Sequence, residues 1–227
     1  NTSAGIYIRA TGNNYGNFSF ANQTNGIEFY NYAGGSTTPI YNNTIVGNRQ
    51  DGVAIGSLAT GGEPVKNNIL AFNIDDGLDD NGDKATDDYN MYYGNGTPYE
   101  GTSEGTYSFS AGADPFYYET TGTATTSASA SVLTVTGTPW TANQYQYYGL
   151  KVSGASCPAT TNSTKWYGIT RNTTDTLYVA PNFDAAPTAN CTYAITNFYL
   201  SEDTTRDTRD TASGAGANLI TGAGDTT

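Results

Sequence analysis

The stretch DGLDDNGDKATDD (76–88) holds the densest group of reactive side chains in the chain, with six aspartates and one lysine. Within it Asp79, Asn81 and Asp83 alternate as D-x-N-x-D, and Asp87 follows four residues later. Short oxygen-bearing side chains in a tight turn can converge on one calcium ion, which takes six to eight oxygen ligands. The sequence therefore predicts a calcium site formed by these four residues. The alternative is an acidic turn that stays hydrated and binds no ion.

This acidic stretch lies at the end of an internal repeat. The segment PIYNNTIVGNRQDGVAI (39–55) aligns with PVKNNILAFNIDDGLDD (64–80) at a spacing of 25 residues. A shorter copy, FSFANQTNGIEF (18–29), comes earlier, and a partial copy, DYNMYYGN (88–95), follows. Because alternate residues of a strand point to opposite faces, these copies predict short strands stacked coil upon coil. The glycine of each copy is expected to take a turn conformation closed to residues with a Cβ.

Successive copies carry an asparagine at one equivalent position. These are Asn22, Asn48, Asn73 and Asn95. In stacked coils their side chains can hydrogen-bond from coil to coil, which satisfies amides that are costly to bury. The pattern resembles the N-N-x-[IV]-x-x-N…G-[IV] repeats (PbH1 type) of secreted bacterial and phage tailspike or adhesin proteins. The resemblance implies an all-β fold in which residues 1–119 form a right-handed parallel β-helix.

Asp80 departs from this repeat. Earlier copies place Phe29 and Ile55 at the equivalent inward position. An inward aspartate without a partner is costly to bury. We therefore expect either that the strand ends at Asp80 or that a cation neutralises the carboxylates.

The second half of the chain has a different character. Strand-like runs separated by Gly, Pro and Asn turns recur through residues 120–196 and predict an inserted all-β module. Cys157 and Cys191 are the only cysteines, and they predict one disulfide in this module. Two separate buried thiols are the alternative.

Residues 197–227 are predicted to return to the β-helix as a C-terminal coil or tail. The segments GADPFYY (112–118), NFYL (197–200) and TASGAGANL (211–219) resemble the D-P-x-F…F-x-L…S-P-A-I-x-A-G ending of many bacterial β-helices. Thr-Ala-Ser-Gly stands here where that ending has Ser-Pro-Ala.

Catalytic chemistry has few candidate residues. Histidine is absent, which excludes Ser-His-Asp and Cys-His catalysis and histidine-based metal centres. The pair Asp75 and Asp76 is similar to the paired aspartates of β-helical polygalacturonases, but the histidine and basic motif of those enzymes are missing. A polysaccharide lyase would need a basic residue, and Arg49, Lys66 and Lys84 are single charges that we expect on solvated faces. We therefore predict no catalytic residue.

Aromatic residues offer a binding surface. Exposed rings are the usual platform for sugars, and the candidates for glycan stacking are Tyr92, Tyr93, Trp140 and Tyr147. The alternative is core packing, because the chain has 19 Tyr and 8 Phe and must fill its interior with them.

The formal net charge is −12, and the nine basic residues are dispersed, which argues against nucleic-acid binding. No apolar run is long enough to span a bilayer. We therefore expect a non-catalytic structural or adhesive protein at an extracellular, cell-surface or virion-surface location. Calcium is the expected cofactor, and a glycan or cell-surface polysaccharide is the expected partner. We also expect a homo-oligomer or fibre. A polysaccharide lyase or glycoside hydrolase of β-helix type is one alternative function, and the subunit of an ordered extracellular fibre is another.

Overall fold

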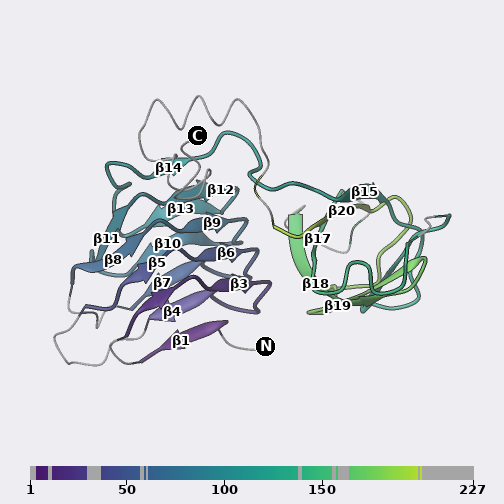
Figure 1. Cartoon of the computed structure of the whole chain (residues 1–227), viewed down its shortest axis with the longest axis horizontal. Coiled ribbons are helices and arrows are strands. Elements are labelled where there is room, and N and C mark those ends of the chain that lie inside the picture. The colour runs from purple at the N-terminus through teal and green to yellow at the C-terminus, as the bar shows by residue number, and fades with distance from the viewer. Residues whose placement is uncertain are drawn as a thin grey trace, which may run out of the picture. The chain divides into compact units, whose positions relative to one another are not determined.

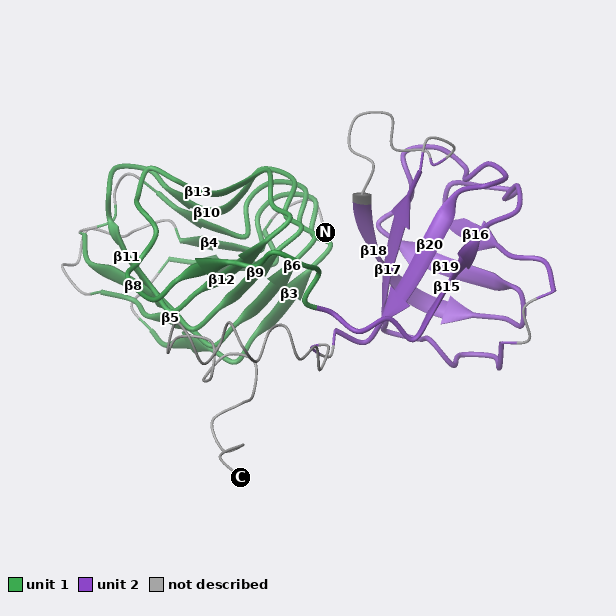
Figure 2. Ribbon diagram, turned by 90° about the horizontal axis from the view of Figure 1, so that it is seen from above, with its two compact units in different colours: residues 1–115, 202–227 green, residues 116–201 purple. Residues whose placement is uncertain are grey.

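The computed structural model shows an all-β chain with no helix among the residues it describes. The described residues are 4–9, 12–29, 37–56, 59, 61–137, 140–154, 157, 164–198 and 200. They fall into two compact units (Figure 2). Unit 1 is described over residues 4–115 and unit 2 over residues 116–200, so unit 2 includes residues on both sides of the module predicted at 120–196. The C-terminal return predicted for 197–227 lies outside the described residues from 201 onward.

Unit 1 is a solenoid in which the chain passes through three parallel sheets in turn (Figure 1). Sheet A has the order β1 (Ile6–Ile8), β4 (Ile27–Phe29), β7 (Val53–Ile55), β10 (Asp76–Asp80), β13 (Thr97–Glu100). Sheet B has the order β2 (Asn14–Tyr15), β5 (Ile40–Tyr41), β8 (Glu63–Lys66), β11 (Ala85–Asp88). Sheet C has the order β3 (Phe18–Phe20), β6 (Thr44–Val46), β9 (Ile69–Ala71), β12 (Met91–Tyr93), β14 (Phe109–Ser110). This is the parallel β-helix architecture that the repeat predicts.

The register of the sheets follows the repeat of the sequence. Val53 of β7 pairs with Leu78 of β10, and Ile45 of β6 pairs with Leu70 of β9, 25 residues apart in both cases. Equivalent residues therefore lie directly above one another. The inward positions are aliphatic or aromatic and form one core along the solenoid axis, which includes Ile27, Ile40, Ile45, Val53, Val65, Leu70, Leu78 and Tyr92.

The glycines of the repeat are required by space. A Cβ on Gly52 would lie 2.5 Å from the carbonyl oxygen of Gly77 and 2.7 Å from the Nδ2 atom of Asn73. Gly52 does not have a positive φ angle, so the expectation of a turn conformation at this position is wrong. The close approach of neighbouring coils excludes a side chain there.

Left-handed backbone conformations occur instead at corners of the coil, directly after sheet C and between sheets B and C. Asn42, Asn67 and Tyr89 occupy the second of these corners in successive coils, each with φ of 56°. Asparagine tolerates this conformation better than most residues because its short polar side chain can hydrogen-bond locally. The first asparagine of each Asn-Asn pair thus lies at the corner. The second lies directly before the strand of sheet C, where asparagines of successive coils stack on one another.

Unit 2 is one six-stranded antiparallel sheet that closes on itself. Its order is β15 (Thr120–Thr123), β20 (Thr192–Thr196), β17 (Gly149–Ser153), β18 (Thr164–Asn172), β19 (Thr176–Ala180), β16 (Val132–Thr134). The amide of Thr125, just after β15, donates to the carbonyl oxygen of Thr134 in β16, 2.8 Å away. This bridge joins the first strand of the order to the last, so the sheet forms a barrel.

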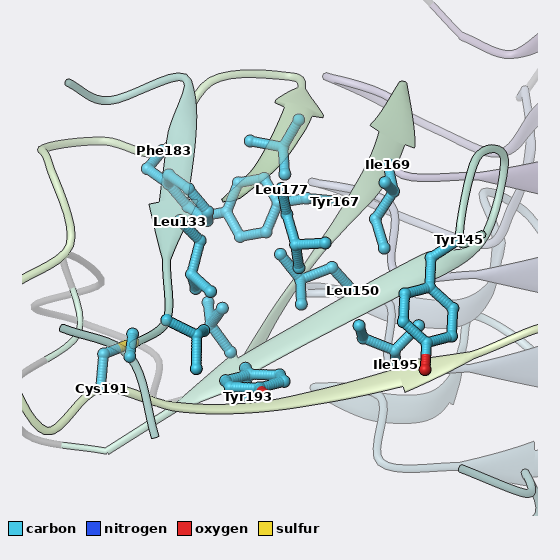
Figure 3. Close-up of a cluster of buried hydrophobic side chains, with 14 of the residues drawn as sticks. Leu133, Tyr145, Leu150, Tyr167, Ile169, Leu177, Phe183, Cys191, Tyr193 and Ile195 are labelled. Carbon is cyan, nitrogen blue, oxygen red and sulfur yellow. The ribbon is translucent and has the colours of Figure 1, made fainter. Parts of the chain in front are cut away.

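The barrel interior is filled by buried side chains from β16, β17, β18, β19 and β20 (Figure 3). Leu133, Leu150, Tyr167 and Leu177 point toward one another there, and all four are at most 1% exposed. Cys157 and Cys191 form the predicted disulfide, with Cα atoms 4.7 Å apart. The bond links the segment that follows β17 to the start of β20.

Candidate functional site: an acidic cleft on unit 1

An open cleft of about 370 Å³ lies on unit 1 along β10. It is lined by Asp51, Asp75, Asp76, Asp79, Asp80, Asn81, Gly82, Glu100 and Gly101. Six of these nine residues carry a carboxylate and none carries a positive charge. The lining is therefore a strongly negative surface in a chain that is already acidic.

Stacking of the coils brings these carboxylates together. The repeat places Asp51 one coil before Asp76, and the backbone amide of Asp76 donates to the carboxylate of Asp51 over 3.1 Å. The amide of Asp51 donates in turn to the side-chain oxygen of Asn25, at 3.1 Å. The hydroxyl of Thr97, in the coil after Asp76, donates to the carboxylate of Asp76. A polar column thus runs along the entry to sheet A, with two aspartates at its centre.

The remaining acids come from β10 and β13. Asp79 pairs with Glu100 in the register of sheet A. Asp75 is exposed, whereas Asp76 is only 4% exposed. Carboxylate oxygens of Asp51, Asp75 and Asp76 lie within 4.8 Å of one another. Three acids at this separation form the part of the cleft most suited to hold a cation.

The electrostatics of the cleft disfavour ionised carboxylates. Burial is the largest effect on Asp51 and raises its pKa to about 6, although the hydrogen bond from Asp76 acts in the opposite direction. The pKa of Asp79 is also raised, by burial and then by the charges of Asp76, Asp80 and Asp75. A bound proton or a bound cation would relieve this repulsion.

The strand β10 ends at Asp80, as the first of the two possibilities that the sequence leaves open predicts, and the side chain is fully buried. Its two carboxylate oxygens accept hydrogen bonds from the backbone amides of Lys84 and Ala85, each at 2.7 Å. The carboxylate therefore caps the turn that follows and is satisfied by the protein itself.

The structure brings together only two of the four predicted calcium ligands. Asp79 and Asn81 line the cleft, whereas Asp83 lies exposed in the turn, with φ of 56°, and is not part of the lining. Asp87 lies in β11 of sheet B, where its carboxylate accepts hydrogen bonds from within unit 1. The donors are the hydroxyl of Tyr92 (2.9 Å), the amide of Gly105 (2.9 Å), the hydroxyl of Ser108 (3.1 Å) and the side-chain amide of Asn90.

Among the six acids of the cleft, the predicted calcium site includes only Asp79, and neither Asp51 nor Glu100 is a candidate residue in the sequence. The signal for Asp51 is present in the repeat, because Asp51-Gly52 and Asp76-Gly77 occupy equivalent positions 25 residues apart. Equivalent positions of stacked coils are neighbours in space. Glu100 belongs to a coil whose sequence no longer shows the repeat, and no comparable signal marks it.

The predicted asparagine ladder is present. Asn22 donates from its side-chain amide to the side-chain oxygen of Asn48 (2.9 Å), Asn48 donates to Asn73 (2.8 Å), and Asn73 to Asn95 (2.9 Å). A second ladder of the same kind runs through Asn17, Asn43, Asn68 and Asn90, with distances of 3.0, 2.9 and 3.0 Å. The interior asparagines of both ladders act as donor and as acceptor, and Asn48 and Asn68 are fully buried.

Two of the four predicted glycan-stacking residues are core residues. Tyr92 is 1% exposed and Trp140 is 5% exposed, so neither ring can meet a sugar. Tyr93 is partly buried and packs edge-on against Phe72. Tyr147, with 80% of its surface exposed, is the one of the four that presents its ring to solvent.

No helix among the described residues is long and apolar enough to cross a membrane. A scan against models of protein families finds no family that matches this chain, and searches of curated proteins and of solved structures find no match either.

Proposed function

We propose that this chain is a non-catalytic structural or adhesive β-helix protein of an extracellular or virion surface, with a divalent cation bound in the acidic cleft. The observation that carries the cation site is the convergence of six carboxylates on one open cleft whose lining holds no positive charge. The disulfide between Cys157 and Cys191 supports an oxidising location, because such bonds persist mainly outside the cytosol.

Calcium suits the donor set best. All of the candidate ligands are oxygens, supplied by carboxylates and by the side-chain amide of Asn81. Calcium accepts mixed sets of six to eight such oxygens in flexible geometry, whereas magnesium demands a compact octahedron. Asp51, Asp75 and Asp76 would form the centre of the site, and Asp79 and Glu100 stand next to one another in neighbouring strands of the same cleft.

Calcium titration of the EDTA-treated protein tests the cation site. Thermal unfolding and isothermal titration calorimetry are expected to show a rise in Tm and saturable binding. The variant Asp76→Asn should lose both effects. The matched control is Asp83→Asn, which removes the same charge from the neighbouring turn but outside the cleft. A Tm that does not respond to calcium would leave a hydrated acidic cleft without an ion.

An adhesive role requires a surface that binds a partner, and we propose that this partner is a glycan. Tyr147 supports the assignment, because an exposed aromatic ring offers an apolar face to a sugar. Binding of the wild type and of Tyr147→Ala to an array of glycans would test it. Tyr117→Ala is the matched control, since Tyr117 is also exposed, at 53%, and also lies in unit 2. Equal binding by all three proteins, or none by any, would remove Tyr147 from the glycan site.

A glycoside hydrolase is the second candidate function, and one observation favours it. The pKa of Asp51 is raised to about 6, and Asp51 lies beside Asp75 and Asp76. A carboxylic acid with a raised pKa, close to a second carboxyl group, is an arrangement that acid-catalysed glycoside cleavage uses. Incubation with neutral and acidic polysaccharides, followed by measurement of new reducing ends, separates the two candidates. Turnover that Asp51→Asn abolishes would establish the enzyme.

A further inference from the structure

The sequence contains three Asn-Gly pairs, at 25–26, 81–82 and 95–96. In such a pair the backbone nitrogen of the glycine can attack the side-chain carbonyl carbon of the asparagine. A C–N bond forms, ammonia leaves, and a five-membered succinimide results. Water then opens the ring at either carbonyl and yields aspartate or isoaspartate. The reaction needs only water, and it is fastest before glycine because no side chain hinders the attack.

The solenoid blocks this reaction at two of the three pairs. The side-chain oxygen of Asn25 accepts the amide of Asp51 (3.1 Å), and the amide of Gly26 donates to the carbonyl oxygen of Asp51 (2.9 Å). Ring closure would require both groups to leave their partners in the next coil. Asn25 is also 9% exposed, which leaves little room for that movement.

Asn95 is held even more completely. Its side-chain oxygen accepts the backbone amide of Asn73 (3.0 Å) and the side-chain amide of Asn73 (2.9 Å). Its own side-chain amide donates to the carbonyl oxygen of Leu70 (2.7 Å), and the amide of Gly96 donates to the carbonyl oxygen of Asn73 (3.2 Å). The asparagine ladder therefore protects this pair chemically as well as satisfying its polar groups.

Asn81 lacks these restraints. Both Asn81 and Gly82 are exposed, and no hydrogen bond to the side-chain amide of Asn81 is found among the described residues. The amide of Gly82 bonds only within its own turn, to the carbonyl oxygen of Asp80 (2.7 Å). A Cβ added to Gly82 would meet nothing closer than the Cε atom of Lys84, at 3.6 Å, so the glycine is not packed closely against the solenoid.

We propose that Asn81 is a site of spontaneous deamidation, at which the folded protein converts a neutral amide of the cleft into a carboxylate. Either product, aspartate or isoaspartate, adds one negative charge to a lining that already holds six carboxylates. Deamidation itself is independent of the proposed function. Its consequence for the cleft, tighter binding of calcium, rests on the proposed cation site.

Peptide mapping by mass spectrometry tests the modification. The full chain is incubated in EDTA at mildly alkaline pH, both folded and unfolded in urea, and the three Asn-Gly peptides are followed over time. In urea all three pairs should convert at similar rates. In the folded protein Asn81 should convert at least about tenfold faster than Asn25 and Asn95, because those two react only after local opening of the solenoid. Asn81→Gln should abolish the conversion at this position, since the longer side chain closes a ring far more slowly.

Two results would overturn the proposed site. One is an intact Asn81 in the folded protein at a time when the unfolded chain has lost it. The other is conversion of all three pairs at one rate in the folded protein.

Calorimetric titration with calcium tests the consequence for the cleft. Asn81→Asp should bind calcium about tenfold more tightly than the wild type, as expected for one unit charge added roughly 6 Å from a divalent ion in water. Asn81→Gln, which keeps the amide, should not bind more tightly than the wild type. If the wild type binds no calcium, the proposed cation site fails while the deamidation result stands. If the wild type binds calcium and Asn81→Asp binds no more tightly, the consequence for the cleft fails.

Discussion

The backbone amide of Asp76 donates a hydrogen bond to the carboxylate of Asp51 across two neighbouring coils, over 3.1 Å. The two residues are separated by 25 positions in sequence and are brought together by the register of sheet A. Both side chains are nearly buried, at 8% and 4% exposure. The solenoid therefore stacks two acids at a place where water can only partly solvate them, and the stability of unit 1 depends on the protonation of Asp51.

The first prediction concerns pH. The folded-state pKa of Asp51, about 6, lies above its ordinary value of 3.8, so the folded protein binds more protons than the unfolded chain between these values. The contribution of Asp51 to the free energy of unfolding should fall as pH rises from about 4 to 6, by up to about 3 kcal/mol, and level off above. The free energies of unfolding of the wild type and of Asp51→Asn are measured in urea with EDTA over a pH series. The difference between the two proteins gives the contribution of Asp51. A difference that grows in favour of the wild type with rising pH would contradict the prediction.

The second prediction concerns the asparagine ladders. Asn68 is fully buried, accepts two hydrogen bonds from Asn43, and donates to Asn90 and to the carbonyl oxygen of Ile40. Asn68→Ala should lower the free energy of unfolding by about 3 to 5 kcal/mol, because several buried polar groups lose their partners at once. Asn17→Ala, at the end of the same ladder, should cost only about 1 kcal/mol. Equal losses in urea unfolding would show that the interior rungs have no special role.

The third prediction concerns the close approach of the coils. Gly52→Ala should destabilise unit 1 by about 3 kcal/mol or more, because the new Cβ would overlap backbone atoms of the next coil that cannot move aside independently. Gly12→Ala is the control, since a Cβ there would meet no atom within 4 Å, and its effect should stay within about 0.5 kcal/mol. Thermal and urea unfolding followed by far-ultraviolet circular dichroism would compare the two. A tolerated Gly52→Ala would mean that the coils can separate locally.

The fourth prediction concerns the disulfide of unit 2. The bond between Cys157 and Cys191 closes a loop with a sequence separation of 34, for which chain entropy predicts a stabilisation of about 4 kcal/mol. Both tryptophans of the chain, Trp140 and Trp166, belong to unit 2, so their fluorescence reports the unfolding of this unit alone. Reduction should move the fluorescence transition to lower urea. The double variant Cys157→Ser/Cys191→Ser should unfold at that lower midpoint with or without reductant, and an unchanged midpoint after reduction of the wild type would refute the prediction.

The architecture of unit 1 could be predicted from the sequence because the spacing of the repeat also determines which residues of successive coils lie above one another. Identical residues at equivalent positions, such as Asn48 and Asn73, must lie above one another if successive coils share one register, and the observed ladder follows directly. Unit 2 has no such repeat. Its strands could be recognised one by one, but their order in the barrel depends on packing between residues distant in the chain, which alternation alone does not encode.

The acidic site shows the limit of grouping residues by their distance in sequence. Asp83 and Asp87 are near Asp79 along the chain, yet the coil turns after Asp80 and carries Asp87 into sheet B. Asp51 is far from Asp79 in sequence but one coil away in space. For the aromatic residues, Tyr92 and Trp140 serve as core side chains because the chain is poor in large aliphatic residues, and composition alone cannot separate the buried rings from the exposed ring of Tyr147.

The second asparagine ladder also gives the solenoid an electrical polarity. Asn17, Asn43 and Asn68 each donate toward the following coil and accept from the preceding one where a partner exists, so their amide dipoles are aligned head to tail and polarise one another. The positive end of this column is the side-chain amide of Asn90, which donates to the buried carboxylate of Asp87. Asp87 thus lies at the positive end of the ladder, much as an anion lies at the amino end of a helix. A column of neutral side chains in this way helps to stabilise a carboxylate inside the protein.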